Sequence, residues 1–270
     1  MADQHQELTQ LLRSLNLSRM ATTFEEVAVR AVRNGRSHEA FLYELARLEC
    51  EHRAQRRSER RLRESGLPLE KTFRTLQLAA FGPRLVQQIE QLRRGAFVQE
   101  AVNVVAVGKP GTGKSHAAAA LGHELISQGQ SVLWTSTASL VQRLLAAKRD
   151  LRLPRELAKL DRIACLILDD IGYVQHDRDE MEVLFTLLAE RYERRSVIIT
   201  TNLVFSEWNR IFKDPMTTLA AIDRVVHHSV ILDLMGLESY RAKEAHAAQN
   251  VSTPTSSRVT VGSVEEAIQL

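Results

Sequence analysis

A run of eight residues combines the side chains and backbone freedom that polyphosphate binding requires. It reads GKPGTGKS from Gly108 to Ser115 and matches the pattern GxxxxGK[ST] in full. Glycines let such a loop wrap around phosphate oxygens with its N–H groups pointing inward. Lys114 is expected to neutralise the β- and γ-phosphates of ATP, and the Ser115 hydroxyl to ligate Mg²⁺. The predicted nucleotide-binding residues of this loop are Gly108, Lys109, Pro110, Gly111, Thr112, Gly113, Lys114, Ser115 and His116.

Two aspartates follow an apolar run further along the chain. Residues 163–168 read IACLIL and lead directly into Asp169 and Asp170. In a parallel sheet the carboxyl ends of the strands meet, so this strand would deliver carboxylates beside the phosphate loop. Asp169 is expected to hold Mg²⁺ together with Ser115, and Asp170 to orient the attacking water. The alternative is that the two aspartates merely begin a surface turn, and the complete phosphate loop argues against it.

A third strand end is polar. Residues 196–200 read SVIIT and are followed by Thr201 and Asn202. Thr and Asn after a strand commonly cap a turn. Beside the other two strand ends, however, they fit a site that senses water or the γ-phosphate.

These groups need a parallel sheet to bring them together, and the chain has the required pattern. Short apolar strands alternate with helical stretches, which predicts an α/β fold with helices on both faces of the sheet. The predicted strands are 101–107, 131–135, 163–168 and 196–200, and the predicted helices are 115–128, 139–159 with an interruption at Pro154, and 179–194.

The N-terminal quarter reads as a small all-helical domain. Leucines recur at helical spacing until Asn16, Asn34-Gly35 marks a turn, and Ser37 is a plausible N-cap for a long helix over 38–64. Ser65-Gly66 ends that helix. We therefore expect a helical domain over 1–66 for partner or DNA binding and self-assembly, an ATPase domain over 67–246, and a disordered Ser- and Thr-rich tail over 247–270.

Composition sets wider limits. The chain has 270 residues, of which 44% are hydrophobic and 26% charged, so most of it should be globular. Its formal net charge is +3. Of the two cysteines, Cys165 sits in an apolar run and is expected to be buried, so no disulfide framework is implied. No signal segment or membrane span is evident, which favours a cytoplasmic protein without a membrane partner.

At this point the sequence resembles a known family. The segments GKPGTGKS, LILDDIGY at 166–173, SVIITTN at 196–202, IDRVVHHS at 222–229 and SYR at 239–241 are similar to those of IstB-type ATPases. These are transposition helpers of bacterial insertion sequences and relatives of DnaC-type helicase loaders. The resemblance extends over nearly the whole chain to about residue 246.

The resemblance implies an AAA+ P-loop ATPase and assigns roles that spacing does not show. Asn202 would be the sensor-1 residue, Arg224 the arginine finger of a neighbouring subunit, and Arg241 a sensor-2-like residue at the nucleotide. Many AAA+ enzymes carry Glu where this chain has Asp170, so slow, switch-like hydrolysis is expected. The predicted catalytic residues are Lys114, Asp169, Asp170, Asn202 and Arg224.

Two groups of arginines are candidates for contacts with duplex DNA. The first repeats at helical spacing in the long N-terminal helix, and the second falls where the AAA+ initiator clade, by resemblance, carries an extra DNA-contacting helix. A merely solvated charged face is the alternative. The predicted DNA-binding residues are Arg53, Arg56, Arg57, Arg60 and Arg61 in the first group, and Arg149, Arg152 and Arg155 in the second.

The histidines carry weaker signals. His227 and His228 are adjacent and on a helix would point about 100° apart, which argues against shared metal ligation. The imidazoles of His116 and His123 have no Cys or second His at ligand spacing, so they are expected to be structural.

The preferred interpretation is an ATP- and Mg²⁺-dependent homo-oligomer that assembles on duplex DNA, selects or remodels a target site and recruits a transposase. A helicase loader that binds single-stranded DNA is the nearest alternative, although few aromatic residues are available for stacking on bases. A small-molecule P-loop kinase and a DNA-binding protein with an inactive ATP site are more distant ones.

Overall fold

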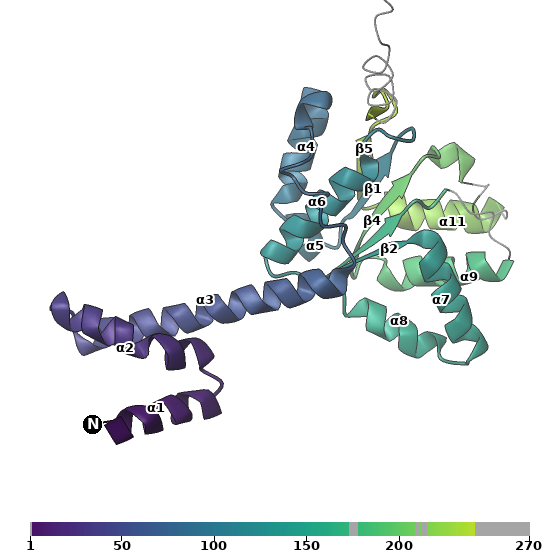
Figure 1. Cartoon of the computed structure of the whole chain (residues 1–270). Helices are drawn as coiled ribbons and strands as arrows, with labels where there is room; N and C mark the ends of the chain where they lie inside the picture. Colours follow the sequence, from purple (N-terminus) through teal and green to yellow (C-terminus); the bar gives the residue numbers. More distant parts are fainter. Residues whose placement is uncertain (1, 173–177, 209–210, 212–214, 241–270) are drawn as a thin grey trace, which may run out of the picture.

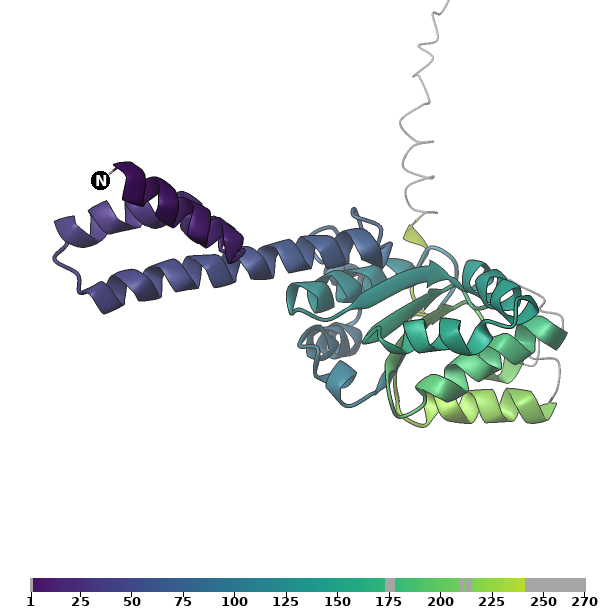
Figure 2. The same cartoon turned by 90° about the horizontal axis from the view of Figure 1, so that it is seen from below.

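The molecule consists of an elongated helical arm and an α/β domain (Figures 1 and 2). The computed structural model describes residues 2–172, 178–208, 211 and 215–240. Arg241 and the predicted tail over 247–270 lie outside these residues. Among the described helices, none has the length and apolar character needed to cross a membrane.

The arm is built from three helices, of which the third continues into the α/β domain. They are α1 (Ala2–Ser14), α2 (Ser18–Arg33) and α3 (His38–Ser65). The predicted start and end of the long helix are confirmed, since the Ser37 side chain accepts a hydrogen bond from the Ala40 N–H and Gly66 caps the helix at φ 69°. The arm has its own small core, centred on Met20, Val27 and Leu45.

Helix α3 belongs to both parts of the molecule. Its N-terminal half packs against α2, and its C-terminal half packs against β2 and α6. There the Ser58 hydroxyl donates to the Ile126 carbonyl at 3.5 Å, and the Arg61 guanidinium donates to the Gly129 carbonyl. A side chain at Gly66 would lie 3.1 Å from the Trp134 carbonyl oxygen, so the chain leaves α3 pressed against β2.

The α/β domain is built on a parallel sheet with the order β2-β3-β4-β1-β5. The predicted parallel sheet is confirmed, with strand ends shifted by one or two residues. The fifth strand was not predicted, because it is an edge strand whose residues are mostly exposed or half-exposed. The strands are β1 (Asn103–Val107), β2 (Val132–Ser136), β3 (Cys165–Asp169), β4 (Ser196–Thr201) and β5 (Ser229–Asp233).

Helices cover both faces of the sheet, as expected. Alternate strand residues point to opposite cores: Val104 and Ile198 face one, and Val105 and Ile199 face the other. The first core is covered by α4 (Pro83–Arg93), α5 (Ala96–Gln99) and α6 (Lys114–Ser127), and the second by α7 (Thr137–Arg149), α8 (Leu153–Asp161), α9 (Arg178–Arg191) and α11 (Pro215–Val226). Two short 3₁₀ helices lie at Leu78–Ala80 and Phe205–Glu207.

One predicted helix is divided differently from the expectation. The break between α7 and α8 lies at residues 150–152, where Leu151 has φ 55°, and not at Pro154. Pro154 stands in the first turn of α8, where the missing N–H costs no helical hydrogen bond.

A buried arginine supports the amino end of the sheet. The Arg191 guanidinium donates to the carbonyl oxygens of Leu160 at 2.9 Å, Ile163 at 3.0 Å and Ser196 at 2.9 Å, and burial lowers its pKa to about 10. Cys165 lies nearby and is buried as predicted, which raises the pKa of its thiol to about 12.

Candidate functional site

The phosphate loop connects the carboxyl end of β1 to the first residue of α6. Gly111 at φ 82° and Gly113 at φ 95° adopt backbone conformations that other residues rarely reach. The buried Lys114 ammonium donates to the carbonyl oxygens of Gly108 at 2.7 Å and Lys109 at 2.9 Å, inside its own loop. The lysine is therefore held at the centre of the loop that would receive the phosphates.

Residues from distant segments line the loop, and sequence reasoning did not assign them a site role. A side chain at Gly113 would lie 3.3 Å from Phe81 Cζ. The Tyr240 N–H donates to the Gly111 carbonyl at 2.9 Å, and the Gln77 amide donates to the Tyr240 hydroxyl at 2.9 Å. No local pattern around residue 77 or 81 could have indicated these contacts, because they depend on how the chain returns to the loop.

The Asp169 carboxylate lies against the start of α6, as predicted. Its Oδ1 accepts a hydrogen bond from the Ser115 hydroxyl at 2.7 Å and a second one from the Thr200 hydroxyl at 2.6 Å. Thr200 also accepts the Asp170 N–H at 2.9 Å and is almost fully buried. Thr200 is thus a site residue that sequence reasoning missed, and its only signal was a hydroxyl at the end of a buried strand.

Asp170 has an unusual backbone and an unfavourable charge environment. Its φ is 65°, which turns the chain sharply at the end of β3. Burial raises the pKa of its carboxyl above the ordinary 3.8, the neighbouring Asp169 charge raises it further, and Lys114 opposes both effects. A carboxyl group with these neighbours can accept a proton more readily than an exposed aspartate.

Asn202 follows β4 at the same end of the sheet. Its Oδ1 is buried and accepts no hydrogen bond from the residues that the structure describes. A side chain at Gly172 would lie 2.3 Å from this oxygen, so only glycine fits beside it. An unsatisfied buried amide oxygen costs stability, and such a group is commonly retained where a ligand or water completes it.

His116, one of the predicted nucleotide-binding residues, contacts the segment that follows α3. Its Nε2 lies 3.1 Å from both the Thr72 carbonyl oxygen and the Thr75 hydroxyl. The imidazole therefore anchors the segment that follows α3, as expected for a structural histidine. His123 is similar, with its Nε2 3.0 Å from the Pro68 carbonyl oxygen.

Arg224 lies away from the phosphate loop of its own chain. Asn103, the first residue of β1, donates its side-chain amide to the Arg224 carbonyl at 3.5 Å, whereas the phosphate loop begins at the other end of that strand. A strand of this length spans roughly 13 Å. The Arg224 guanidinium packs on the Phe185 ring at 4.7 Å and donates to the Ala220 carbonyl at 3.3 Å.

The sequence matches the model of the IstB-like ATP-binding protein family over residues 10–248. The chain belongs to this family. Together with the phosphate loop and the Asp169 strand, this confirms the predicted ATP-binding ATPase.

Two relatives are similar in sequence to nearly the whole of this IstB-like chain. It is 44% identical over 240 residues to an insertion sequence ATP-binding protein of Sinorhizobium fredii, which covers 88% of this chain and 80% of the relative. It is 36% identical over 243 residues to the ATP-binding protein of insertion sequence IS21 from Pseudomonas aeruginosa, which covers 90% and 91% of the two chains.

Solved structures confirm the predicted AAA+ fold. DnaI is similar with a TM-score of 0.53 at 17% identity, covering 63% of this chain and 95% of DnaI. AMPPCP-bound DnaA from Aquifex aeolicus is similar with a TM-score of 0.52 at 14% identity, covering 69% of this chain and 56% of DnaA.

The first arginine group of the IstB-like chain is only partly available to a partner. Arg53 donates to the buried Glu49 carboxylate at 2.9 Å and to the Asn16 carbonyl at 2.8 Å, so it joins the helices of the arm. Burial alone would raise the pKa of Glu49, but hydrogen bonds from the Met20 N–H and from Arg53 lower it. Arg61 is likewise held by the Gly129 carbonyl, and Arg60 lies 4.0 Å from the Glu64 carboxylate. Arg56 and Arg57 are exposed.

The second arginine group surrounds the break between α7 and α8. Arg149, Arg152 and Arg155 are all exposed, and Arg152 pairs with Asp150 at 2.7 Å. No ion pair joins Arg149 or Arg155 to another residue in the described part of the chain.

The expectation that His227 and His228 diverge as on a helix is wrong. Helix α11 ends at Val226, so both histidines lie beyond it, and their ring centroids are 4.5 Å apart.

Proposed function

We propose that this IstB-like chain is an ATP-dependent DNA-binding regulator of transposition. It assembles as a homo-oligomer on duplex DNA, selects or remodels a target site, and recruits and activates the transposase of the same insertion sequence. The S. fredii and P. aeruginosa relatives are ATP-binding proteins of insertion sequences, which supports the link to transposition. The ATP dependence rests on one observation: Ser115 of the phosphate loop and Thr200 of β4 both hydrogen-bond Asp169 Oδ1.

When the phosphate loop binds a nucleotide, hydrogen bonds within the loop are replaced by hydrogen bonds to phosphate. Lys114 is held by two loop carbonyls and would exchange them for phosphate oxygens. Ser115 Oγ and Asp169 Oδ1 are hard oxygen donors 2.7 Å apart, a donor set that fits Mg²⁺. These two residues would hold the ion, which offsets phosphate charge when bound.

Hydrolysis depends on Asp170 and Asn202. The raised pKa of Asp170 suits a group that orients and deprotonates water, and the unsatisfied Asn202 oxygen is available to accept a hydrogen bond from that water. Aspartate is one methylene shorter than glutamate, so it positions water less well. Slow hydrolysis that resets an assembly is therefore proposed.

Arg224 acts on the nucleotide of a neighbouring subunit. Its position at the amino end of the sheet keeps it from its own phosphate loop, which supports action between subunits. Each ATP site is then complete only at a subunit interface, so ATP favours assembly by mass action. Arg241 is proposed to contribute to the nucleotide site in a sensor-2-like role.

DNA contacts come from the exposed arginines of both groups. Arg56 and Arg57 stand midway along α3, and Arg149 and Arg155 flank the break between α7 and α8. Contacts of this kind go to phosphates, so binding should depend strongly on salt and weakly on sequence.

The proposed function is tested by measuring DNA binding and the size of the resulting particles in the same samples. Labelled duplex and single-stranded DNA are titrated with ATP, ADP or no nucleotide, for the wild type, Arg224→Ala and Arg194→Ala. Arg194 is an exposed arginine at the same end of the sheet and serves as the matched control. We expect large ATP-dependent assemblies on duplex DNA for the wild type and the control, and their loss in Arg224→Ala.

Other outcomes would redirect the proposal. A preference for single-stranded DNA would favour a helicase loader. No DNA binding by the wild type under any nucleotide condition would contradict both functions.

A further inference from the structure

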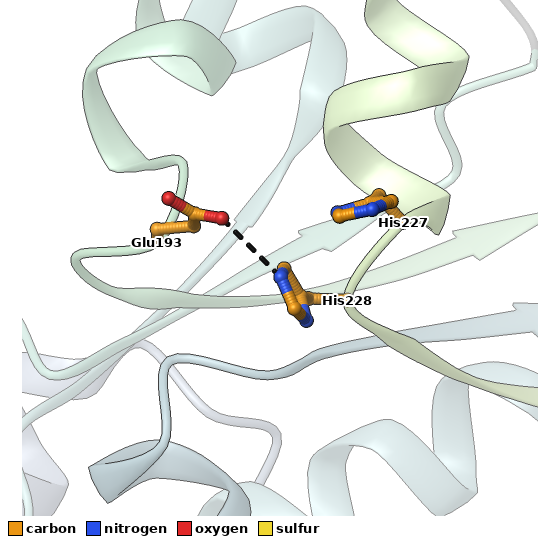
Figure 3. Close-up of side chains that lie close together, drawn as sticks. All are labelled: Glu193, His227 and His228. Carbon is orange, nitrogen blue, oxygen red and sulfur yellow. Dashed lines mark ion pairs between the residues drawn. The ribbon is translucent and has the colours of Figure 1, made fainter.

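Three potential metal ligands converge at the amino end of the sheet (Figure 3). Glu193 lies in the turn between α9 and β4, and His227 and His228 lie in the turn between α11 and β5. One ligand atom from each residue lies within 4.8 Å of the others. All three side chains are exposed, so an ion in solution can reach them.

We propose that Glu193, His227 and His228 form a binding site for a divalent transition-metal ion of the Zn²⁺ class. Two imidazoles and one carboxylate are a donor set that Zn²⁺ uses, with water in the remaining position. His228 Nε2 and Glu193 Oε1 are 3.2 Å apart, close to the roughly 3.3 Å that separates two ligands in a tetrahedral site with 2.0 Å bonds. The ligand nitrogen of His227 lies within 4.8 Å of the other two ligand atoms, and the exposed Glu193 and His228 side chains can move toward it to complete the set.

A neighbouring residue orients one of these imidazoles. The Tyr192 hydroxyl lies 3.2 Å from His227 Nδ1. Metal-bound imidazoles usually engage their second nitrogen in such a contact, which fixes the ring and its tautomer. With Nδ1 engaged by Tyr192, His227 Nε2 is the nitrogen that binds the metal.

The backbone around the site is fixed before any ion binds. The His228 carbonyl accepts the Asn103 N–H at 2.7 Å, and the His227 N–H donates to the Asp223 carbonyl at 2.9 Å. On the other side, the N–H groups of Arg194 and Arg195 donate to the Arg191 carbonyl at 3.0 Å each. Binding therefore costs mainly side-chain entropy, because the turns that carry the ligands are already ordered.

The charges near the site set its strength. Glu193 contributes one negative charge and Asp223 lies close enough to influence Tyr192, whereas Arg224 opposes a bound cation. With three exposed ligands and this balance, we expect a dissociation constant on the order of micromolar. A bound ion would join the turn after α9 to the turn after α11.

The experiment uses the untagged full-length chain, stripped of metal by a chelator and studied without nucleotide. Zn²⁺ is titrated by calorimetry, and Co²⁺ is titrated by visible absorption, which reports tetrahedral nitrogen and oxygen ligation. We expect one equivalent of each ion to bind. His228→Gln and Glu193→Gln should each weaken binding by about tenfold or more and remove the Co²⁺ band, and Tyr192→Phe should weaken binding by about tenfold.

Two control variants locate the ion. His38→Gln removes an exposed histidine at the start of α3, and Asp169→Asn removes the carboxylate at the phosphate loop; neither should change Zn²⁺ affinity. Circular dichroism of the metal-free variants checks that they fold. The proposal is overturned if folded wild type binds no Zn²⁺ at micromolar concentrations, or if His228→Gln and Glu193→Gln bind it as tightly as wild type.

Discussion

Each end of the parallel sheet holds a buried cationic side chain that is hydrogen-bonded to backbone carbonyl groups. The two side chains differ in which parts of the chain they connect. At the carboxyl end, Lys114 is bonded to Gly108 and Lys109, two residues of a single loop. At the amino end, Arg191 is bonded to carbonyls of α8, of the turn before β3 and of β4.

The two cations differ in how much of the structure is disturbed when their hydrogen bonds to carbonyl groups are broken. Release of Lys114 disturbs one loop, so a ligand can replace its partners at little cost. Release of Arg191 would remove a donor from carbonyls of three separate elements in a dry core, which is costly. A buried cation therefore indicates a binding site only where its partners can be replaced.

The largest expected effect comes from the amino end. Arg191→Met keeps much of the side-chain volume but removes the donors, so the free energy of unfolding should fall by about 3–5 kcal/mol. Denaturant unfolding measures this, with Arg195→Met, an exposed neighbour, as the control. An equal loss in both variants would contradict a special role for Arg191.

Lys114→Ala tests the carboxyl end. ATP hydrolysis should fall by about 100-fold or more, because the phosphates lose their principal cation. The melting temperature should fall less than in Arg191→Met, since the two hydrogen bonds that Lys114 donates lie within a single loop. Phosphate release and thermal unfolding are measured on the same sample, and a large loss of stability would show that Lys114 is structural like Arg191.

Thr200→Val should reduce hydrolysis by about tenfold and raise the Mg²⁺ concentration required, because Asp169 loses one of its two hydroxyl donors. Thr200→Ser keeps the hydroxyl and should restore both. Thr201→Val is the matched control, since the Thr201 hydroxyl serves the turn at Leu203 instead. Steady-state hydrolysis rates are measured across Mg²⁺ concentrations. Equal effects of Thr200→Val and Thr201→Val would argue against a positioning role for Thr200.

The smallest effect concerns Asp170. Its folded-state pKa is raised above the ordinary 3.8, so its charged form destabilises the folded protein above pH 3.8, fully so above the folded-state pKa. Asp170 is only partly buried, so solvent screens its charge, and Asp170→Asn should raise stability at neutral pH by less than about 1 kcal/mol. The gain should shrink as pH falls toward 3.8. Asparagine tolerates the same positive φ. Thermal unfolding between pH 5 and 8 follows the gain, and a loss of stability at pH 7 would contradict it.

Local signals in the sequence were sufficient for much of the fold. The phosphate loop, the cap at Ser37 and the helix stop at Gly66 each depend on neighbouring residues, and each was predictable. The parallel sheet followed from strand and helix alternation. The missed strand β5 and the shifted break at Leu151 depend on packing and turn geometry that periodicity does not report.

The remaining site residues depend on topology. Thr200 contacts Asp169 because β4 lies beside β3, and Phe81 approaches Gly113 because the segment after α3 folds back over the loop. The arginine spacing in α3 indicated a single basic face, but it could not show that Arg53 is held by Glu49 and by the turn after α1. Spacing reports which residues share a face and not which partners that face meets.

Helix α3 gives the molecule a mechanical property. It runs unbroken for 28 residues, and only its C-terminal half is seated on the α/β domain (Figure 2). The free half, about 14 residues long, acts as a lever of roughly 20 Å. A tilt of about 10° at the seat would move the tip by roughly 4 Å. His116 follows Ser115 in the phosphate loop and bonds to the segment after α3. A small movement of the phosphate loop can therefore tilt α3 and produce a larger displacement at the tip of the arm.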